Sequence, residues 1–201
     1  MLKLLTAIVG LFYGPILYGQ TLTSNPISAQ KLPAEIIVKG KVVQAQQFTD
    51  ALGDNILVLT QVAEQNSSKQ NSDSREAYLY GYRFVKQEGK FTQLWMIQDW
   101  VKACEFDISC EFIKGSVAIT DLNKNGMAET SFLYKTACRS DVSPATLKLI
   151  MHEGATKYAI RGTTLYTGIG GEKTIDASFN KADKSLLDFA IKQWNKFKKE
   201  D

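Results

Sequence analysis

Alternation of aromatic and other residues between positions 78 and 84 is the clearest pattern in the first half of the chain. A period of two is expected of a β-strand, so the alternation predicts a strand with one aromatic face. A Gln-Glu-Gly-Lys turn at 87–90 and an apolar run at 91–97 predict the returning strand of a hairpin. The aromatic residues are Tyr78, Tyr80, Tyr82 and Phe84. Such a row usually packs a half-buried sheet, and it can also stack on sugars or bases.

Other short runs of apolar and β-branched residues predict further strands. They lie at 35–43, 56–60, 111–120, 130–137, 147–151, 158–160, 161–166 and 174–179. The polar run 65–75 predicts a mobile loop, and 152–156 predicts a hairpin turn that contains the only histidine, His152. The pattern over 95–101 fits either a continued strand or a short helix.

The end of the chain changes to a helical period. Apolar residues recur every three or four positions over 181–199, which predicts an amphipathic helix. Asn180 lies three residues before Asp183, a spacing that resembles a capping box. We expect the helix to pack on a sheet through Trp194 and Phe197. The predicted fold class is therefore α+β, with mainly antiparallel β hairpins and a C-terminal amphipathic helix packed on the sheet.

The first residues predict a targeting signal rather than an element of the folded domain. Lys3 precedes a mostly apolar run at 4–17, which is too short to span a membrane and is typical of a secretory signal. We therefore expect a signal peptide at 1–19, a flexible leader without regular structure at 20–34 and a single β-rich domain at 35–201. Cleavage after Gly19 is preferred to cleavage after Ala29, and an uncleaved N-terminal anchor is the alternative.

Charge and composition exclude some partners. The formal net charge is +3, and removal of 1–19 takes away only Lys3, which leaves 3 − 1 = +2. Such a weak charge does not favour nucleic acid or an anionic membrane surface as a partner. No later apolar run is long enough for a membrane span after signal cleavage. We therefore expect an exported bacterial protein that is periplasmic or secreted.

The clearest candidate for a binding site is a run of oxygen-bearing side chains at alternate positions between two β-like segments. Its oxygen donors are the side chains of Asp121, Asn123, Asn125 and Glu129 and the carbonyl of Met127. Calcium prefers six to eight oxygen ligands, and a loop with acceptors at its first, third and fifth positions directs them to one point. Gly126 occupies the sixth position, where the chain must turn sharply. The pattern predicts a structural Ca²⁺ site.

Two features separate this loop from an EF-hand. Its twelfth position is Phe132 instead of a bidentate acid, and the flanking segments are predicted strands. Only Asp121 and Glu129 carry full charges, so we expect weak binding of the millimolar class. The alternative is a polar hairpin turn built on Asn125-Gly126, which is a strong turn signal by itself.

The three cysteines allow at most one intramolecular disulfide. Pairing of the hairpin about Asn125 would place Cys138 opposite Phe112 and near Cys110. Bridges from Cys138 to Cys104 and to Cys110 both stay open on sequence alone. Zinc is disfavoured, because the chain has one histidine and no close cysteine pair.

Three runs together carry a family resemblance: 121–129, 137–144 and 147–162. They resemble a family of small exported bacterial proteins that is described as involved in surface polysaccharide biosynthesis, and the resemblance covers about 95–175. It implies pairing of Cys104 with Cys138. It also implies a biological role at the cell surface, but no reaction and no catalytic residues.

The residues after the last cysteine, Arg139, Ser140 and Asp141, have two interpretations. They form either a recognition loop or a solvated loop in which Asp141 starts a turn before Pro144. Motifs for catalysis are sparse, so an enzyme is disfavoured.

These observations favour an exported non-catalytic envelope protein that binds surface polysaccharide or supports its assembly. Its expected partners are envelope polysaccharide or an envelope protein. One alternative is an enzyme that acts on envelope glycan with acids such as Asp99, Glu105 or Asp141, and another is a purely structural secreted protein.

Overall fold

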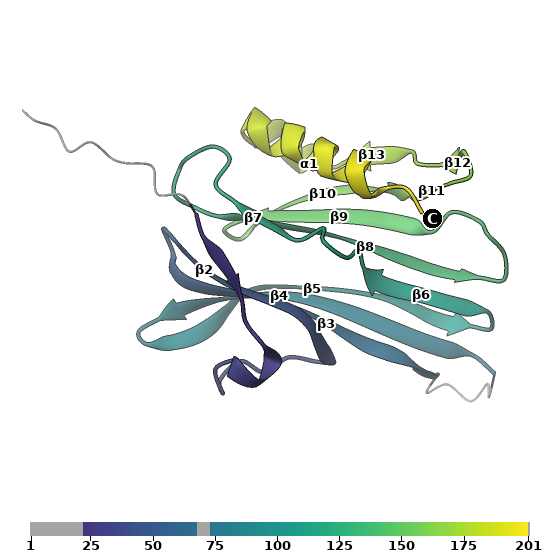
Figure 1. Cartoon of the computed structure of the whole chain (residues 1–201), viewed down its shortest axis with the longest axis horizontal. Coiled ribbons are helices and arrows are strands. Elements are labelled where there is room, and N and C mark those ends of the chain that lie inside the picture. Colours follow the sequence, from purple (N-terminus) through teal and green to yellow (C-terminus); the bar gives the residue numbers. More distant parts are fainter. Residues whose placement is uncertain (1–21, 68–72, 201) are drawn as a thin grey trace, which may run out of the picture.

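Two antiparallel sheets lie face to face, and one helix covers the outer side of the second sheet (Figure 1). The computed structural model describes residues 22–67 and 73–200. Sheet A has the order β1-β2-β3-β4-β5 and consists of β1 (Ser24–Pro26), β2 (Lys41–Asp50), β3 (Gly53–Asn66), β4 (Arg75–Gln87) and β5 (Lys90–Cys104). The predicted signal peptide at 1–19 lies outside the described residues.

Sheet B completes the sandwich. Its order is β13-β10-β9-β8-β6, built from β13 (Lys173–Ile175), β10 (Thr156–Thr163), β9 (Thr146–Glu153), β8 (Glu129–Arg139) and β6 (Asp107–Phe112), and β7 (Ala118–Thr120) also pairs with β8. The remaining elements are η1 (Ala29–Lys31), β11 (Leu165–Tyr166), β12 (Ile169–Gly170), η2 (Ala177–Lys181) and α1 (Lys184–Phe197). The predicted α+β class is confirmed. Within the described ranges, no helix is long and apolar enough to cross a membrane.

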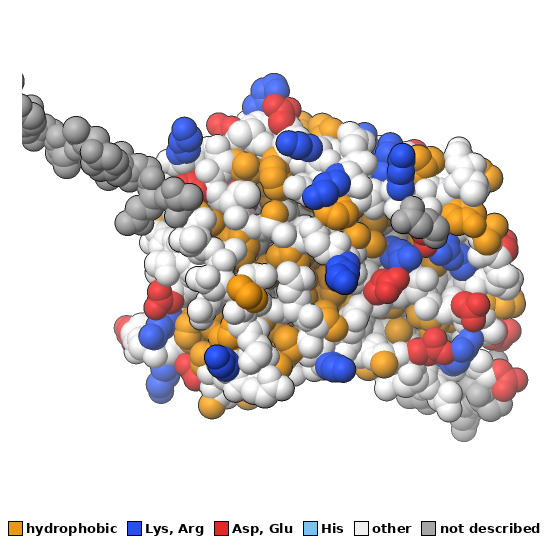
Figure 2. Space-filling model, in the orientation of Figure 1, with side chains coloured by type: hydrophobic (Ala, Val, Ile, Leu, Met, Phe, Trp, Pro, Cys, Tyr) orange, Lys and Arg blue, Asp and Glu red, His pale blue; other side chains and the backbone are white. Residues whose placement is uncertain are grey.

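The main core fills the space between the sheets. Leu59, Leu79 and Ile97 from sheet A pack there with Phe132 and Ile150 from sheet B. Burial of side chains of this size contributes about 1.5–3 kcal/mol each. Figure 2 shows hydrophobic side chains across the middle of one face of the molecule, with Lys and Arg side chains among and around them.

The C-terminal helix packs on sheet B as predicted. Trp194 is completely buried against this outer face, and Phe197 packs at the rim of the same cluster. The N-cap is Asp183, whose carboxylate accepts a hydrogen bond from the backbone amide of Ser185 at 2.8 Å. The predicted start at Asn180 was wrong, because residues 177–181 form η2 and an acid directly before the helix is the better cap.

The outer face of sheet A carries the predicted aromatic row. Neighbouring rings from Tyr78 to Phe84 stack with centroids 6.0–6.5 Å apart. Residues 27–38 cover most of this row, with Ile36 buried against it. The expected leader without regular structure is thus corrected: β1 pairs with β2, and the following residues close a second hydrophobic cluster.

Several predicted strands have different limits. β2 begins only at Lys41, and the ambiguous segment 95–101 continues β5 as one strand. The predicted strand 111–120 is two strands, β6 and β7, separated by a turn at Gly115 with φ +75°. The last strand ends at Ile175, where the chain enters η2. Residues 65–66 of the predicted loop extend β3, and 68–72 lie outside the described residues.

Candidate functional site

The oxygen-rich loop joins β7 to β8 and curls its polar side chains onto its own backbone. Asp121 Oδ2 accepts a hydrogen bond from the amide of Gly126 at 3.1 Å. The side-chain oxygens of Asn123 and Asn125 accept from the amides two residues further on, at 3.2 and 2.8 Å. Gly126 has φ +82°, the left-handed conformation that glycine adopts most readily. The alternation in the sequence therefore does bring these side chains to one loop.

Glu129 is the most deeply buried member of the predicted set. Its side chain is fully buried, and Oε2 accepts from the amide of Leu122 and the hydroxyl of Thr120, both at 2.9 Å. Oε1 of Glu129 and Oδ1 of Asp121 are buried without a hydrogen-bond partner. Burial raises the pKa of Glu129, and the two donated hydrogen bonds oppose that shift.

A further acid, Glu153 of β9, reaches the same loop. Its Oε1 accepts hydrogen bonds from the amide groups of Asn123 at 2.6 Å and Asn125 at 2.8 Å. β8 and β9 pair so that Glu153 lies directly opposite Glu129. Glu153 is not predictable from the local sequence pattern, because only the register of these two strands places it beside the loop.

The end of the loop is fixed to sheet A. The carbonyl of Gly126 accepts from the amide of Ala51 at 2.7 Å, and the amide of Ala128 donates to Asp50 Oδ2 at 2.9 Å. Arg83 donates to the Ala128 carbonyl at 3.1 Å and to Asp50 Oδ2 at 2.5 Å, and both charged side chains are completely buried. The loop therefore forms part of the junction between the two sheets, which its sequence did not indicate.

Most of the groups that the loop could offer to a metal ion are uncharged. Among residues 22–67 and 73–200, no group of three or more His, Cys, Asp or Glu side chains is placed to hold a metal ion. The loop offers two carboxylates, two amide side chains and the Met127 carbonyl instead. Such a set is suited to a hard cation that takes oxygen ligands and is unsuited to zinc.

The disulfide joins Cys104 at the end of β5 to Cys138 near the end of β8, with the Cα atoms 5.7 Å apart. The pairing that the family resemblance implies is therefore present, and Cys110 is free. The predicted register was wrong: Cys138 lies opposite Ile108 and Cys110 opposite Thr136. The turn between β6 and β7 shifts the pairing, because both short strands pair with the same long strand.

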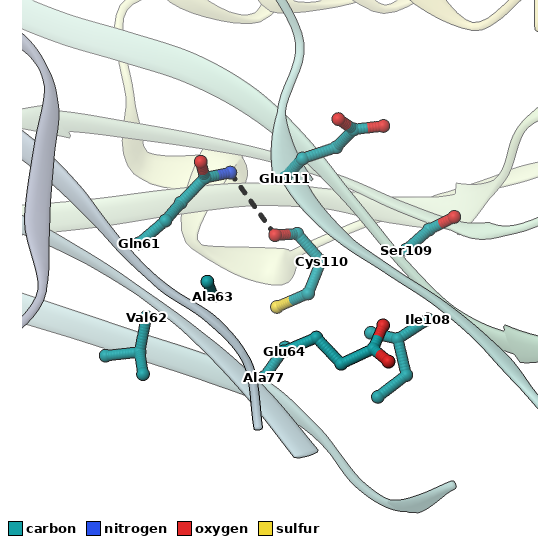
Figure 3. A pocket seen from close by; sticks show the side chains of 9 residues that line it. All are labelled: Gln61, Val62, Ala63, Glu64, Ala77, Ile108, Ser109, Cys110 and Glu111. Atoms are coloured by element: carbon teal, nitrogen blue, oxygen red, sulfur yellow. Dashed lines mark hydrogen bonds between the residues drawn. The ribbon is translucent and has the colours of Figure 1, made fainter. Parts of the chain in front are cut away.

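A shallow pocket of about 220 Å³ lies between β3 and β6 (Figure 3). Gln61 donates to the backbone carbonyl of Cys110 at 3.2 Å across it. Burial raises the pKa of the Cys110 thiol to about 12, so the thiol stays protonated and is a poor nucleophile near neutral pH. Glu64 and Glu111 also line the pocket.

The predicted recognition residues are partly engaged in structural contacts. Arg139 donates to Glu200 Oε1 at 2.5 Å and also to the Ser143 carbonyl. Asp141 Oδ1 accepts from the amide of Ser143 at 3.0 Å, as expected of a turn, and Ser140 is exposed. Burial raises the pKa of Glu200, but hydrogen bonds from Arg139, Lys135 and Thr164 outweigh it and bring the pKa to about 2.

His152 was predicted in a hairpin turn, and this prediction was wrong. It belongs to β9, is 2% exposed and stacks on Trp95 with ring centroids 4.0 Å apart. Burial, with the nearby charges of Lys157 and Arg83, lowers the pKa of His152 to about 3. The imidazole is therefore a neutral core side chain at physiological pH.

One end of the aromatic row stays uncovered. Trp100 lies opposite Tyr78 on the neighbouring strand and is 46% exposed. Lys102 Nζ lies 4.6 Å from the ring centroid of Trp100 and 5.3 Å from that of Tyr78. The sequence pattern gave no prediction for Trp100, because the period of segment 95–101 is ambiguous. We call Tyr78, Trp100 and Lys102 the open aromatic end.

The three acids considered for catalysis differ in their surroundings. Asp99 accepts from the Tyr134 hydroxyl at 2.9 Å and from Lys148 at 2.5 Å, which links β5 to β8 and β9. Glu105 is exposed after β5, and Asp141 is exposed after β8. None of the three is among the residues that line the pocket of Figure 3.

Comparison with known proteins identified no relative of the chain. Neither the family models nor the curated proteins nor the solved structures that were searched contain a match to the chain. The resemblance to surface polysaccharide proteins therefore stays a prediction, and function has to be argued from the site itself.

Proposed function

We propose that the protein is an exported, non-catalytic envelope domain that binds surface polysaccharide through the open aromatic end of sheet A. The observation that carries this proposal is the exposure of Trp100, at 46%, next to Tyr78 and Lys102. Residues 27–38 cover the remainder of the same row, where Tyr80, Tyr82 and Phe84 are buried. Contiguous exposed apolar surface is a typical sign of an interaction site, and the rings of Trp100 and Tyr78 lie side by side on neighbouring strands.

The chemistry of this surface is suited to a sugar. Flat rings provide apolar contact for the C–H faces of a pyranose, and two hydrogen-bonded strands hold them with little conformational freedom to lose. Polar groups lie beside the rings: Gln98 donates to the Tyr80 hydroxyl at 3.4 Å, and the ammonium group of Lys102 lies next to the rings of Tyr78 and Trp100. The flexible stem of Lys102 allows its ammonium group to move aside and bind a sugar hydroxyl or carboxylate.

Export and the lack of catalysis have separate support. A disulfide between Cys104 and Cys138 is expected in an oxidising compartment outside the cytoplasm. The enzyme alternative requires a site that joins an acid to an aromatic wall. Asp99 is instead held by Lys148 and the Tyr134 hydroxyl, and Glu105 and Asp141 are exposed. No contact of the described residues favours one of these acids as a catalytic group.

Tryptophan fluorescence tests the proposal directly. Of the three tryptophans, Trp95 is 8% exposed and Trp194 is fully buried, so acrylamide should quench mainly Trp100. Polysaccharide extracted from the surface of the source bacterium should reduce this quenching and should retard the protein in affinity electrophoresis. Trp100→Ala should abolish both effects, whereas Val142→Ala, at a residue that is 66% exposed elsewhere, should preserve them. Unchanged quenching and mobility of the wild-type protein would refute the proposal.

A further inference from the structure

Two carboxylate oxygens at the β7–β8 loop are buried and have no hydrogen-bond partner. They are Oε1 of Glu129, whose side chain is fully buried, and Oδ1 of Asp121. An unpartnered carboxylate oxygen is costly in a protein interior, because it loses its water and gains no compensating donor. A cation between these oxygens would remove that cost.

Both carboxylates are bonded to the backbone of the curled part of the loop. Oε2 of Glu129 accepts from the amide of Leu122, next to Asp121, so the carboxylate of Glu129 faces the loop. Asp121 Oδ2 accepts from the amide of Gly126, which closes the loop from the other side. The side-chain oxygens of Asn123 and Asn125 lie within the same short segment.

We propose that this loop binds a calcium ion through Asp121 Oδ1 and Glu129 Oε1. The amide oxygens of Asn123 and Asn125 and the carbonyl of Met127 supply neutral ligands. Calcium fits better than magnesium, because a mixed loop of side-chain and backbone oxygens suits a larger ion with a flexible coordination shell. Calcium also fits better than zinc, since no cysteine or histidine belongs to the loop.

Glu153 acts as a positioning residue in this site. Its Oε1 holds the amide nitrogens of Asn123 and Asn125, at 2.6 and 2.8 Å. An amide group whose nitrogen is held by a fixed carboxylate has its oxygen oriented as well, which is how outer groups tune a metal site. Glu153→Gln should therefore weaken calcium binding without abolishing it.

The site is coupled to the whole sandwich. The last residues of the loop bond to the β2–β3 turn through Ala51 and Asp50, and to β4 through Arg83. On the other side, the side chain of Met127 lies against Gly154 in the β9–β10 turn. Calcium at the loop should therefore raise the melting temperature of the entire fold.

The test is thermal unfolding of the purified full chain with chelator and with 0.1–10 mM CaCl₂ or MgCl₂, together with calorimetric titration of CaCl₂. Calcium at ten times a millimolar Kd should raise Tm by about 3–6 °C. Glu129→Gln and Asp121→Asn should lose this rise and the calorimetric signal. Glu105→Gln, an exposed acid outside the loop, should keep both.

Two outcomes overturn the proposal. One is a wild-type Tm that does not change up to 10 mM CaCl₂. The other is a calcium effect that persists in both Asp121→Asn and Glu129→Gln. Glu153→Gln is the safeguard if one of these variants fails to fold: an unchanged calcium affinity in it would remove the positioning role. An equal response to magnesium would replace calcium by a generic divalent ion and would also contradict the assignment.

Discussion

The two ends of β8 join the sheets by different chemistry. At its last residues, Cys138 forms a covalent bond to Cys104 of sheet A. At its first residues, the connection consists of hydrogen bonds and charges between Ala128, Asp50 and Arg83, with the buried Glu129 beside them. In Figure 1 the disulfide end lies to the right and the β7–β8 loop to the left.

Because of this difference, the stability of each end depends on different solution conditions. A disulfide depends on the redox state of the compartment and is otherwise indifferent to pH and ions. Buried charges depend on proton and cation binding, since each must be compensated in the folded state. We therefore expect the stability of the loop end to change with pH and with cations, and the stability of the disulfide end to stay the same under these changes.

The largest expected effect is at the loop end, in the pair of Arg83 and Asp50. Arg83→Met should reduce the free energy of unfolding by about 3–5 kcal/mol, because it leaves Asp50 buried without its charge partner. Urea denaturation measures this loss. Arg75→Met is the matched control: its partner Glu64 and Arg75 itself are more than a third exposed, so we expect a change of no more than about 0.5 kcal/mol. Similar losses in the two variants would contradict the account.

The disulfide end should contribute somewhat less. The double variant Cys104→Ala with Cys138→Ala should lose about 2–4 kcal/mol of unfolding free energy, mainly because the unfolded chain becomes less restricted. Denaturation with and without reductant measures it, and the variant should no longer respond to reductant. Cys110→Ala serves as the control and should keep the response, because Cys110 is a free thiol. Loss of the reductant effect in that control would mean that the pairing is wrong.

A smaller effect should distinguish the ends by pH. His152 lies opposite Thr130, near the loop end of β8, and its folded pKa of about 3 is below the ordinary value of 6.5. As the pH falls below 6.5, His152 binds a proton in the unfolded chain but not in the folded protein. The contribution of His152 to the free energy of unfolding is therefore fully present above pH 6.5 and is lost towards pH 3. The loss due to His152 should be about 2 kcal/mol between pH 7 and pH 5.

The variant His152→Phe isolates this contribution. It keeps a ring against Trp95 but cannot bind a proton, so its unfolding free energy should vary less between pH 7 and pH 5 than that of the wild-type protein. Above pH 7 the two proteins should show parallel pH profiles. An identical slope in both proteins below pH 6.5 would exclude His152 as the source of the acid sensitivity.

Patterns of one element were predictable from the sequence, and contacts between distant elements were not. The alternation from Tyr78 to Phe84 and the helical period up to Phe197 depend on local spacing, and both elements are present. The oxygen-rich loop was found for the same reason. Burial of Arg83 with Asp50 and the approach of Glu153 depend on sheet register, which one-residue changes in the turns alter completely.

Errors at His152 and at the first residues share another cause. A Gly-containing turn next to His152 masked the fact that the strand extends through it to Glu153. The polar and Pro-containing segment around Pro26 gives no strand signal of its own, but an edge strand needs only one partner and tolerates proline. Tertiary contacts decide both positions.

Hydrogen exchange with and without 10 mM CaCl₂ tests the central claim most directly, because it reads the two ends of β8 separately. We predict slower amide exchange with calcium at the loop end, in residues 50–55 and 120–131, and little change at the disulfide end, in residues 104–110 and 136–140. Reductant should have the opposite distribution. Equal changes at both ends, or no calcium effect at residues 120–131, would contradict the account.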